Sequence, residues 1–234
     1  MSSPKRVLIT GASRGIGLTF AKHYKSHGWN VIAAVRDPAN AKELIDLQLE
    51  KIVRLDVANE ESILEAAATV GPNVPIDLLI NNAGILANDN LETATRASIL
   101  QHFEVNALGP WLVTRAFLPS LEIAAKSASS GPTIVAQVTS QMGSIERNTT
   151  GKYYAYRSSK SALNSLTKSL SVDLKPHGIT CILLHPGYVQ TDMTAHNGEI
   201  TTEESVAGLT TILSNATADD NGRFYHTNGT ILPW

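Results

Sequence analysis

Short apolar runs alternate along this chain with longer stretches in which apolar residues recur at helical spacing. Apolar runs of about 4–8 residues bounded by turn residues are typical of strands buried in a parallel sheet. The runs predict strands at residues 6–10, 30–35, 51–55, 76–80, 133–138, 179–184 and 223–233, the last interrupted by Asn228-Gly229.

The stretches between these strands predict helices with recognisable ends. One follows a glycine-rich turn and runs through His27, and another follows Asn59, a residue type that caps helix N-termini. Further helices are expected at 95–120, with an irregularity at Gly109-Pro110, at 154–174 and at about 203–213. This alternation predicts an α/β fold: one doubly wound parallel sheet of about seven strands with helices on both faces.

The chain shows no linker, internal repeat or low-complexity tract, so residues 1–234 are expected to form one domain. A polar segment at 191–202 predicts a substrate lid, which we place within about 188–215, with an inert loop as the alternative. A loop of small residues is expected at 127–132.

Composition narrows the class of protein. A hydrophobic fraction of 43% in 234 residues is enough to build a sizeable core. The formal net charge of -2 and the lack of a basic tract argue against a nucleic-acid partner. The strand pattern begins at Arg6, no apolar run approaches the length of a membrane span, and the single cysteine, Cys181, lies in an apolar run. We therefore expect a cytoplasmic protein without a membrane partner.

The first candidate for chemistry is the pair Tyr156 and Lys160, four residues apart on one face of a predicted helix. At an effective dielectric constant of ~20, an adjacent ammonium favours the phenolate by up to ~4 kcal/mol. That would lower the phenol pKa from ~10 by as much as ~3 units. A tyrosine of this kind exchanges a proton with a carbonyl or alcohol oxygen. A chance pairing on a helix face is the alternative.

A glycine-rich turn follows the first predicted strand and precedes a helix, with the spacing Gly11-x-x-x-Gly15-x-Gly17. Glycines allow a sharp turn and close approach of a ligand, and the helix N-terminus offers free N–H groups to a phosphate. The arrangement indicates nucleotide binding, although three glycines in a turn are also found for structural reasons alone.

The end of the second predicted strand bears on the choice of nucleotide. An acidic residue at this position binds the ribose 2′-hydroxyl of NAD, whereas an arginine accommodates the 2′-phosphate of NADP. Here Val35 stands where the acidic residue is expected and Arg36 follows, while Arg14 in the glycine turn adds a second positive charge. We predict NADP(H), with a solvated Arg36 paired to Asp37 as the alternative.

Further polar residues stand at strand ends or inside apolar stretches. Asp56 closes the third strand, where it could accept a hydrogen bond from the adenine amino group, and Asn81-Asn82-Ala83-Gly84 follows the fourth. Thr139-Ser140 closes the fifth strand. Asn106 lies in an apolar helical stretch, where its amide must find partners or cost stability.

Together these motifs resemble those of short-chain dehydrogenases/reductases, over nearly the whole chain. They occur in the family's order: the glycine turn, Asp56-Val57, the Asn-Asn-Ala-Gly segment, Asn106, Ser140, Tyr156-x-x-x-Lys160, and Pro186-Gly187 with Thr191. Within the family, the chain is most similar to small NADPH-dependent carbonyl reductases of the sniffer and C-factor type. The resemblance implies a Rossmann-type fold and a catalytic set of Ser140, Tyr156, Lys160 and Asn106.

The resemblance also implies the cofactor contacts. The glycine turn would hold the pyrophosphate, Asp56 and Val57 the adenine, and Lys160 the nicotinamide ribose, while the backbone carbonyl of Asn106 would hold a water in a proton relay. The expected cofactor-binding residues are Gly11, Ser13, Arg14, Gly15, Ile16, Gly17, Arg36, Asp56, Val57, Asn82, Ala83, Gly84, Tyr156, Lys160, Pro186, Gly187, Val189 and Thr191. No metal site is expected.

The catalytic serine has two candidates. Family members commonly carry it about a dozen residues before the tyrosine, which fits Ser144, but Ser140 ends the fifth strand in the Thr-Ser pair where the family places this residue. We favour Ser140 and an insertion in the following loop. Neither Tyr153 nor Tyr154 replaces Tyr156, because neither is followed by a lysine four residues later.

The expected reaction is the reversible reduction of a ketone or aldehyde by NADPH. A cofactor-binding regulatory or signalling protein, in which turnover is incidental, is the alternative. The substrate is a small molecule whose pocket should involve Leu86, Tyr154, Tyr188, Met193 and the segment 191–202. By resemblance, a homodimer or homotetramer is expected, and the apolar face of the helix at 156–174 permits it.

Overall fold

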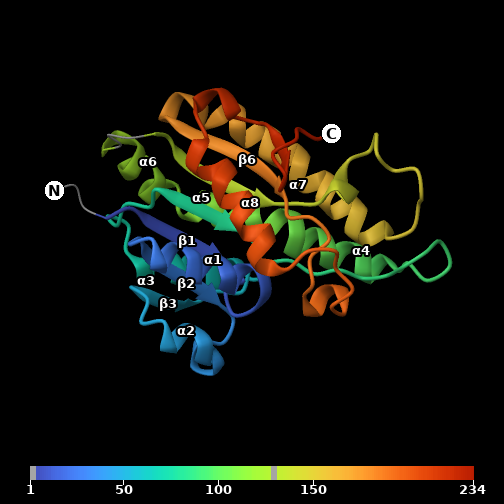
Figure 1. Cartoon of the computed structure of the whole chain (residues 1–234), viewed down its shortest axis with the longest axis horizontal. Helices are drawn as coiled ribbons and strands as arrows, with labels where there is room; N and C mark the ends of the chain where they lie inside the picture. The colour runs from blue at the N-terminus through green and yellow to red at the C-terminus, as the bar shows by residue number, and fades with distance from the viewer. Residues whose placement is uncertain (1–3, 128–130) are drawn as a thin grey trace.

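A computed structural model describes residues 4–127 and 131–234, and it shows one sheet of parallel strands in the order β3-β2-β1-β4-β5-β6-β7 (Figure 1). The strands are β1 (Arg6–Thr10), β2 (Asn30–Val35), β3 (Lys51–Arg54), β4 (Leu78–Asn81), β5 (Thr133–Val138), β6 (Ile179–His185) and β7 (Phe224–His226). The predicted α/β fold class is confirmed. Residues 128–130 of the loop expected at 127–132 lie outside the described residues.

Helices cover both faces of the sheet (Figure 1). One face packs against α1 (Gly15–Ser26), α2 (Lys42–Asp46) and α8 (Thr202–Asn215). The other packs against α3 (Glu60–Val70), α5 (Gly109–Ala116), α6 (Leu118–Ser127) and α7 (Tyr154–Asp173), and α4 (Arg96–Phe103) packs along α7. The strands are therefore buried on both sides, which explains their nearly continuous apolar runs.

Several element boundaries follow from local chemistry. Asn59 caps α3 as predicted, because its side chain accepts a hydrogen bond from Ser62 N at 3.0 Å. Thr201 caps α8 in a reciprocal pair with Glu204. Strand β4 begins at Leu78 rather than residue 76, because Ile76 N bonds Ser120 O instead of a neighbouring strand.

The helix predicted at 95–120 is three helices joined by breaks. Between α4 and α5 the chain forms a π-turn at Glu104–Leu108, and a second break at Phe117 separates α5 from α6. Pro110 explains the first break, since it has no N–H to donate to the carbonyl four residues earlier. The predicted irregularity at Gly109-Pro110 was correct, but the single helix was wrong.

The end of the chain needs one further correction. The strand expected at 223–233 is short, because the chain turns at Asn228-Gly229 and Ile231 pairs back against Tyr225 in antiparallel sense. The helix predicted at about 203–213 is confirmed as α8, which buries Val206 and Leu209 against the core, while the lid placed within about 188–215 stays a prediction. No helix in the described parts of the chain is long and apolar enough to cross a membrane.

The strand order reverses between β1 and β4, and this is where ligands bind in sheets of this kind. The segments that leave these strands touch: a Cβ on Gly11 would lie 2.9 Å from the Ala83 Cα. The predicted glycine turn and the segment Asn82–Gly84 therefore meet at this carboxyl edge of the sheet.

Candidate active site

Three of the predicted catalytic side chains come together at the end of β5. Tyr156 and Lys160 lie on one face of α7, and the Lys160 Nζ is 5.7 Å from the centre of the Tyr156 ring. Lys160 Nζ donates to the carbonyl of Val138 at 2.9 Å, and the Ser140 hydroxyl is hydrogen-bonded to that of Tyr156. All three side chains are buried. The structure thus places a serine, a phenol and an amine in one enclosed polar cluster.

The pKa of Tyr156 contradicts the expected effect of Lys160. Burial raises the Tyr156 pKa to about 12, and the hydrogen bond from Ser140 offsets only part of this. Burial also lowers the Lys160 pKa to about 8, because the ammonium loses its hydration. The cost of burying a phenolate therefore exceeds the attraction of the neighbouring ammonium, and the side chains alone leave Tyr156 protonated at neutral pH.

The two candidate serines have different partners. Ser144 Oγ donates to Trp234 O at 3.0 Å and accepts a hydrogen bond from Arg147 N at 3.3 Å. Ser140 bonds Tyr156, and its Oγ also accepts from Met142 N at 3.1 Å. Ser144 is thus engaged in fixing the chain's last residue, whereas Ser140 faces the phenol, so the geometry favours Ser140.

Asn106 lies in the π-turn and its amide is fully bonded. Its Nδ2 donates to Ile85 O at 2.9 Å and to Ser159 Oγ at 3.0 Å, while its Oδ1 accepts from Ile85 N at 2.8 Å. The expectation that this buried amide finds partners is confirmed. Because Pro110 has no N–H, the backbone carbonyl of Asn106 also lacks the donor that an α-helix would supply.

Gly84 connects this asparagine to the catalytic cluster. A Cβ on Gly84 would lie 3.1 Å from Asn106 Oδ1 and 3.7 Å from Lys160 Nζ. The backbone of the Asn82–Gly84 segment therefore passes directly over Lys160. A side chain at this position would occupy the space above the lysine.

The glycine turn has the features of a phosphate cradle. Helix α1 begins at Gly15, and Arg14, the residue before it, makes no capping hydrogen bond to the first-turn N–H groups. A Cβ on Gly17 would lie 2.2 Å from Gly11 O, so only glycine fits there. Asn82 braces the turn by donating to Thr10 O at 3.1 Å and to Gly11 O at 3.2 Å. The open N–H groups and the close-packed turn fit the pyrophosphate of a dinucleotide.

The two arginines expected at the ribose differ in their surroundings. Arg36 is exposed at the end of β2, and Asp37, its suggested partner, accepts from Asn40 Nδ2 at 2.6 Å instead. Arg14 forms an ion pair with Asp192 at 3.0 Å, and both side chains are largely exposed. The structure therefore leaves Arg36 available for an anion, while Arg14 is joined to the predicted lid.

The remaining predicted cofactor residues lie on the same edge. Asp56 Oδ1 accepts from Ala58 N at 3.0 Å beside Val57. Pro186 O accepts from Ser205 Oγ, which fixes the turn after β6, and Gly187 adopts a positive φ of 88°. The other members of the set at this edge are Ser13, Ile16, Val189 and Thr191. A Cβ on Gly15 would lie 3.4 Å from the Thr191 side chain, so the turn after β6 reaches the glycine turn.

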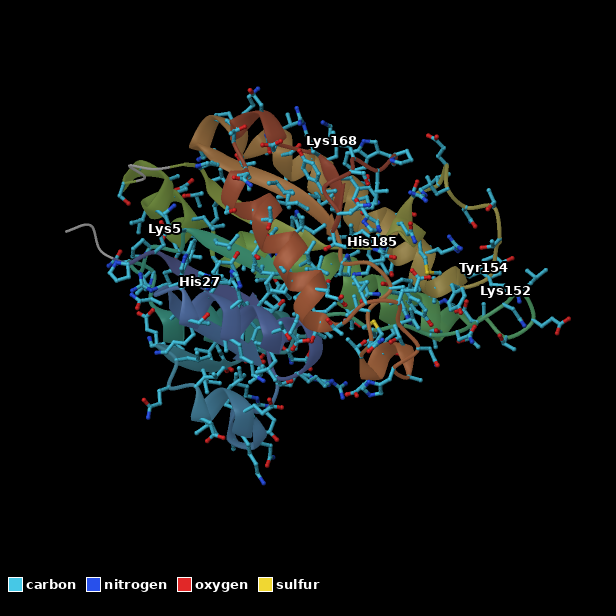
Figure 2. The ribbon with its side chains drawn as sticks, viewed as in Figure 1. Lys5, His27, Lys152, Tyr154, Lys168 and His185 are labelled. Carbon is cyan, nitrogen blue, oxygen red and sulfur yellow. The ribbon has the colours of Figure 1, made fainter. Side chains whose placement is uncertain are left out.

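Sequence reasoning missed three polar residues near this site. The Ser159 hydroxyl accepts a hydrogen bond from the Asn106 amide. In the sequence, only its position next to Lys160 could have drawn attention to it. Asp192 follows Thr191 directly, but its ion-pair partner, Arg14, is far away in the sequence. His185 is buried at the end of β6, just before the Pro-Gly turn, with neither ring nitrogen hydrogen-bonded (Figure 2). No cluster of His, Cys, Asp and Glu suited to a metal ion occurs within residues 4–127 and 131–234.

Comparison with known proteins gives consistent matches. The profile of the family described as short chain dehydrogenase matches residues 5–201. The C-signal of Myxococcus xanthus is 42% identical over 172 residues, which is 73% of this chain and all of the relative. The NADPH-bound carbonyl reductase from chicken fatty liver superposes with a TM-score of 0.93 at 36% identity, covering 100% of both chains. The carbonyl reductase Sniffer of D. melanogaster has the same TM-score at 33% identity, over 99% of this chain and 100% of its own.

Proposed function

Because the chain belongs to the short-chain dehydrogenase/reductase family, we propose that it is an NADP(H)-dependent oxidoreductase that reduces a ketone or aldehyde to an alcohol. The predicted resemblance to small carbonyl reductases of the sniffer and C-factor type is confirmed by the comparisons. The observation that carries the proposal is the buried cluster of Ser140, Tyr156 and Lys160, which the segment Asn82–Gly84 connects to the glycine turn.

The catalytic cluster is suited to a carbonyl oxygen. Ser140 and Tyr156 offer two adjacent hydroxyl groups, which stabilise the negative charge that develops on the oxygen during reduction. With a pKa of about 12, Tyr156 carries its proton at neutral pH and donates it to the forming alkoxide, a stronger base. Lys160, with a pKa of about 8, stays mostly protonated and adds positive charge beside the phenol. The nicotinamide, when bound, supplies the hydride.

The expected site of the 2′-phosphate supports NADP(H) over NAD(H). Val35 provides no carboxylate for a ribose hydroxyl, and the exposed Arg36 makes no hydrogen bond or ion pair within the described residues. A planar guanidinium binds phosphate in a bidentate manner. We therefore assign the 2′-phosphate to Arg36, with Arg14 as a second contact once its pair with Asp192 opens.

Asn106 supports the proposed proton relay. Pro110 leaves the backbone carbonyl of Asn106 without its helical donor, and the neighbouring Gly84 leaves room beside Lys160. A water on that carbonyl would connect Lys160 to solvent and return a proton to Tyr156 after each turnover.

The substrate pocket is proposed at the same edge. Tyr154, Tyr188 and Met193 are exposed there, and Leu86 follows the Asn82–Gly84 segment. Between 188 and 201 the lid segment is joined to itself by hydrogen bonds from Gln190 N to Ile200 O and from Glu199 N to Tyr188 O. This mixture of aromatic and apolar side chains suits a small, partly apolar aldehyde or ketone.

The test is a panel of aldehydes and ketones, with consumption of NADPH as the readout. The proposal predicts steady oxidation of NADPH with at least one class of carbonyl compound. A second function deserves the same experiment, because the 42% identical Myxococcus relative bears the name C-signal. Tight NADPH binding without turnover across the whole panel would support a regulatory or signalling protein and contradict the reductase.

A further inference from the structure

Helix α7, which carries the catalytic pair, does not cap its own N-terminus. Tyr153, the residue before it, has φ 53° and ψ 42° and makes no side-chain capping bond, and the first turn holds no acidic residue. Lys152 also has a positive φ, of 56°. Two successive non-glycine residues in the left-handed region are unfavourable and persist only where surrounding contacts fix them. The catalytic tyrosine lies just inside this strained entry, at the third position of the helix.

Asp89 supplies the missing contacts from the loop that follows β4. Its backbone carbonyl accepts from Tyr153 N at 2.7 Å, and its carboxylate Oδ2 accepts from Ala155 N at 3.3 Å. Asp89 is only 6% exposed, and its Oδ1 has no hydrogen-bond partner. A carboxylate at a helix N-terminus satisfies an otherwise free N–H and compensates the helix dipole. Lys152 and Tyr154 mark this entry at the outer end of α7 (Figure 2).

The loop that carries Asp89 is itself fixed on both sides. Before it, Ile85 is bonded through its N–H and its carbonyl to the Asn106 side chain. After it, Asn90 Oδ1 accepts from Glu92 N and Thr93 N at 2.9 and 3.0 Å. Asp89 therefore contacts α7 from a loop that hydrogen bonds hold on both sides and that begins at the predicted cofactor segment.

Two contacts, one from this loop and one from the π-turn after α4, lie on either side of the catalytic tyrosine. Asp89 holds Ala155, the residue before Tyr156, and Asn106 holds Ser159, three residues after it. One end of this turn of helix is thus bound to the loop after β4 and the other to the π-turn after α4, and Ile85 joins that loop to Asn106. A shift of that turn would move the phenol away from Ser140.

We propose that Asp89 is a positioning residue for Tyr156: a helix cap, supplied from the loop after β4, that sets the phenol against Ser140. The inference rests on the proposed reductase function and adds a residue to it. The hydrogen bonds of Asp89 go to the backbone of Tyr153 and Ala155, so it acts through α7.

The test compares Asp89→Ala with Asp89→Asn in the full chain. Misplacement of a reacting group by about 1 Å costs up to roughly 100-fold in rate, so Asp89→Ala should lower kcat roughly tenfold or more. The KM for NADPH should stay unchanged. Asn caps helices about as well as Asp, so Asp89→Asn should restore kcat to within about threefold of the parent.

Thr95→Ala is the matched control, because Thr95 caps α4 by accepting from Ser98 N at 3.1 Å and lies outside the catalytic cluster. It should lower thermal stability while kcat remains at the parent value. A comparable loss of kcat in Thr95→Ala would mean that any lost cap slows the enzyme, and would overturn the specific role of Asp89.

Amide hydrogen exchange gives a readout that does not need turnover. Asp89→Ala should accelerate exchange in the first turn of α7, while exchange in α8 stays as in the parent. An active parent with kcat and first-turn exchange both unaffected by Asp89→Ala would overturn this inference alone. A parent that reduces no carbonyl compound would instead overturn the proposed function, and with it any catalytic role for Asp89.

Discussion

Lys160 and Tyr156 illustrate how burial and charge compete over one pair of residues. Their spacing in the sequence predicted a phenol of lowered pKa, but both groups are buried, which favours the neutral form of each. The protonated phenol that results is the form that donates a proton during reduction. The reverse reaction uses the same groups, and the cofactor ratio sets the direction.

At the same scale, Arg36 is expected to select the cofactor. Arg36→Ala should weaken NADPH binding roughly tenfold or more, because it removes a charge-assisted contact worth about 1.5–3 kcal/mol. NADH, which has no 2′-phosphate, should bind as it does to the parent. Titration of both cofactors by fluorescence measures this.

Arg96→Ala, which removes an exposed cation at the start of α4, serves as the control and should change neither affinity. Equal NADH and NADPH affinities in the parent, left unchanged by Arg36→Ala, would show that the end of β2 does not contact a phosphate.

At the scale of elements, the apolar runs predicted the strands of the described residues, because most of them are covered on both faces and carry a nearly unbroken hydrophobic signal; the edge strand β3 has exposed Lys51 and Arg54 at its ends. Helix α2 gave too short a pattern to be noticed. Gly109-Pro110 indicated an irregularity at the π-turn. Its geometry, however, depends on a tertiary contact, because the backbone at Gly109 packs so closely on Val57 that a Cβ there would lie 2.6 Å from Val57 O. Asp89 could not be found from the sequence, because its partner lies 66 residues away.

Pro110→Ala tests the π-turn. Alanine restores an N–H that can bond the Asn106 carbonyl and removes a helix-breaking residue that costs up to about 3 kcal/mol in a helix interior. We expect kcat to fall while the melting temperature stays or rises. A lower kcat without a lower melting temperature distinguishes the loss of the proton relay from a general loss of stability. If a structure of Pro110→Ala shows the new N–H bonded to the Asn106 carbonyl and kcat still equals that of the parent, the relay through Asn106 is ruled out.

At the scale of the whole molecule, the order of the strands determines the site, and no pattern in the sequence specifies that order directly. The residues of the site are spread from Gly11 to Thr191 and meet because the carboxyl ends of parallel strands share one edge. The expected homodimer or homotetramer remains a prediction. On α7, Leu163 is buried within its own chain, whereas Val172 is exposed.

Stability of the whole molecule should depend on pH through His185. Burial, reinforced by the charges of His226 and Arg147, lowers the His185 pKa from 6.5 to about 3. The unfolded chain therefore binds a proton below pH 6.5 that the folded chain does not, so stability present above pH 6.5 is lost as the pH falls. Between pH 7 and pH 5 the parent should lose about 2 kcal/mol through this group.

Urea unfolding at several pH values measures the effect. His185→Asn, which cannot titrate, should show a flatter dependence in this range. The lowered pKa values of Asp37, Glu204 and Asp220 act in a more acidic range. The same slope in the parent and in His185→Asn would contradict a neutral buried histidine.

The central claim, that Tyr156 protonates a carbonyl held beside NADPH, is tested most directly by the turnover of Tyr156→Phe. The variant keeps the ring and removes the hydroxyl, so it should fold, still bind NADPH and lose carbonyl reduction by about 100-fold or more. A folded Tyr156→Phe protein that binds NADPH and reduces the same carbonyl compound at the parent's rate would contradict the account.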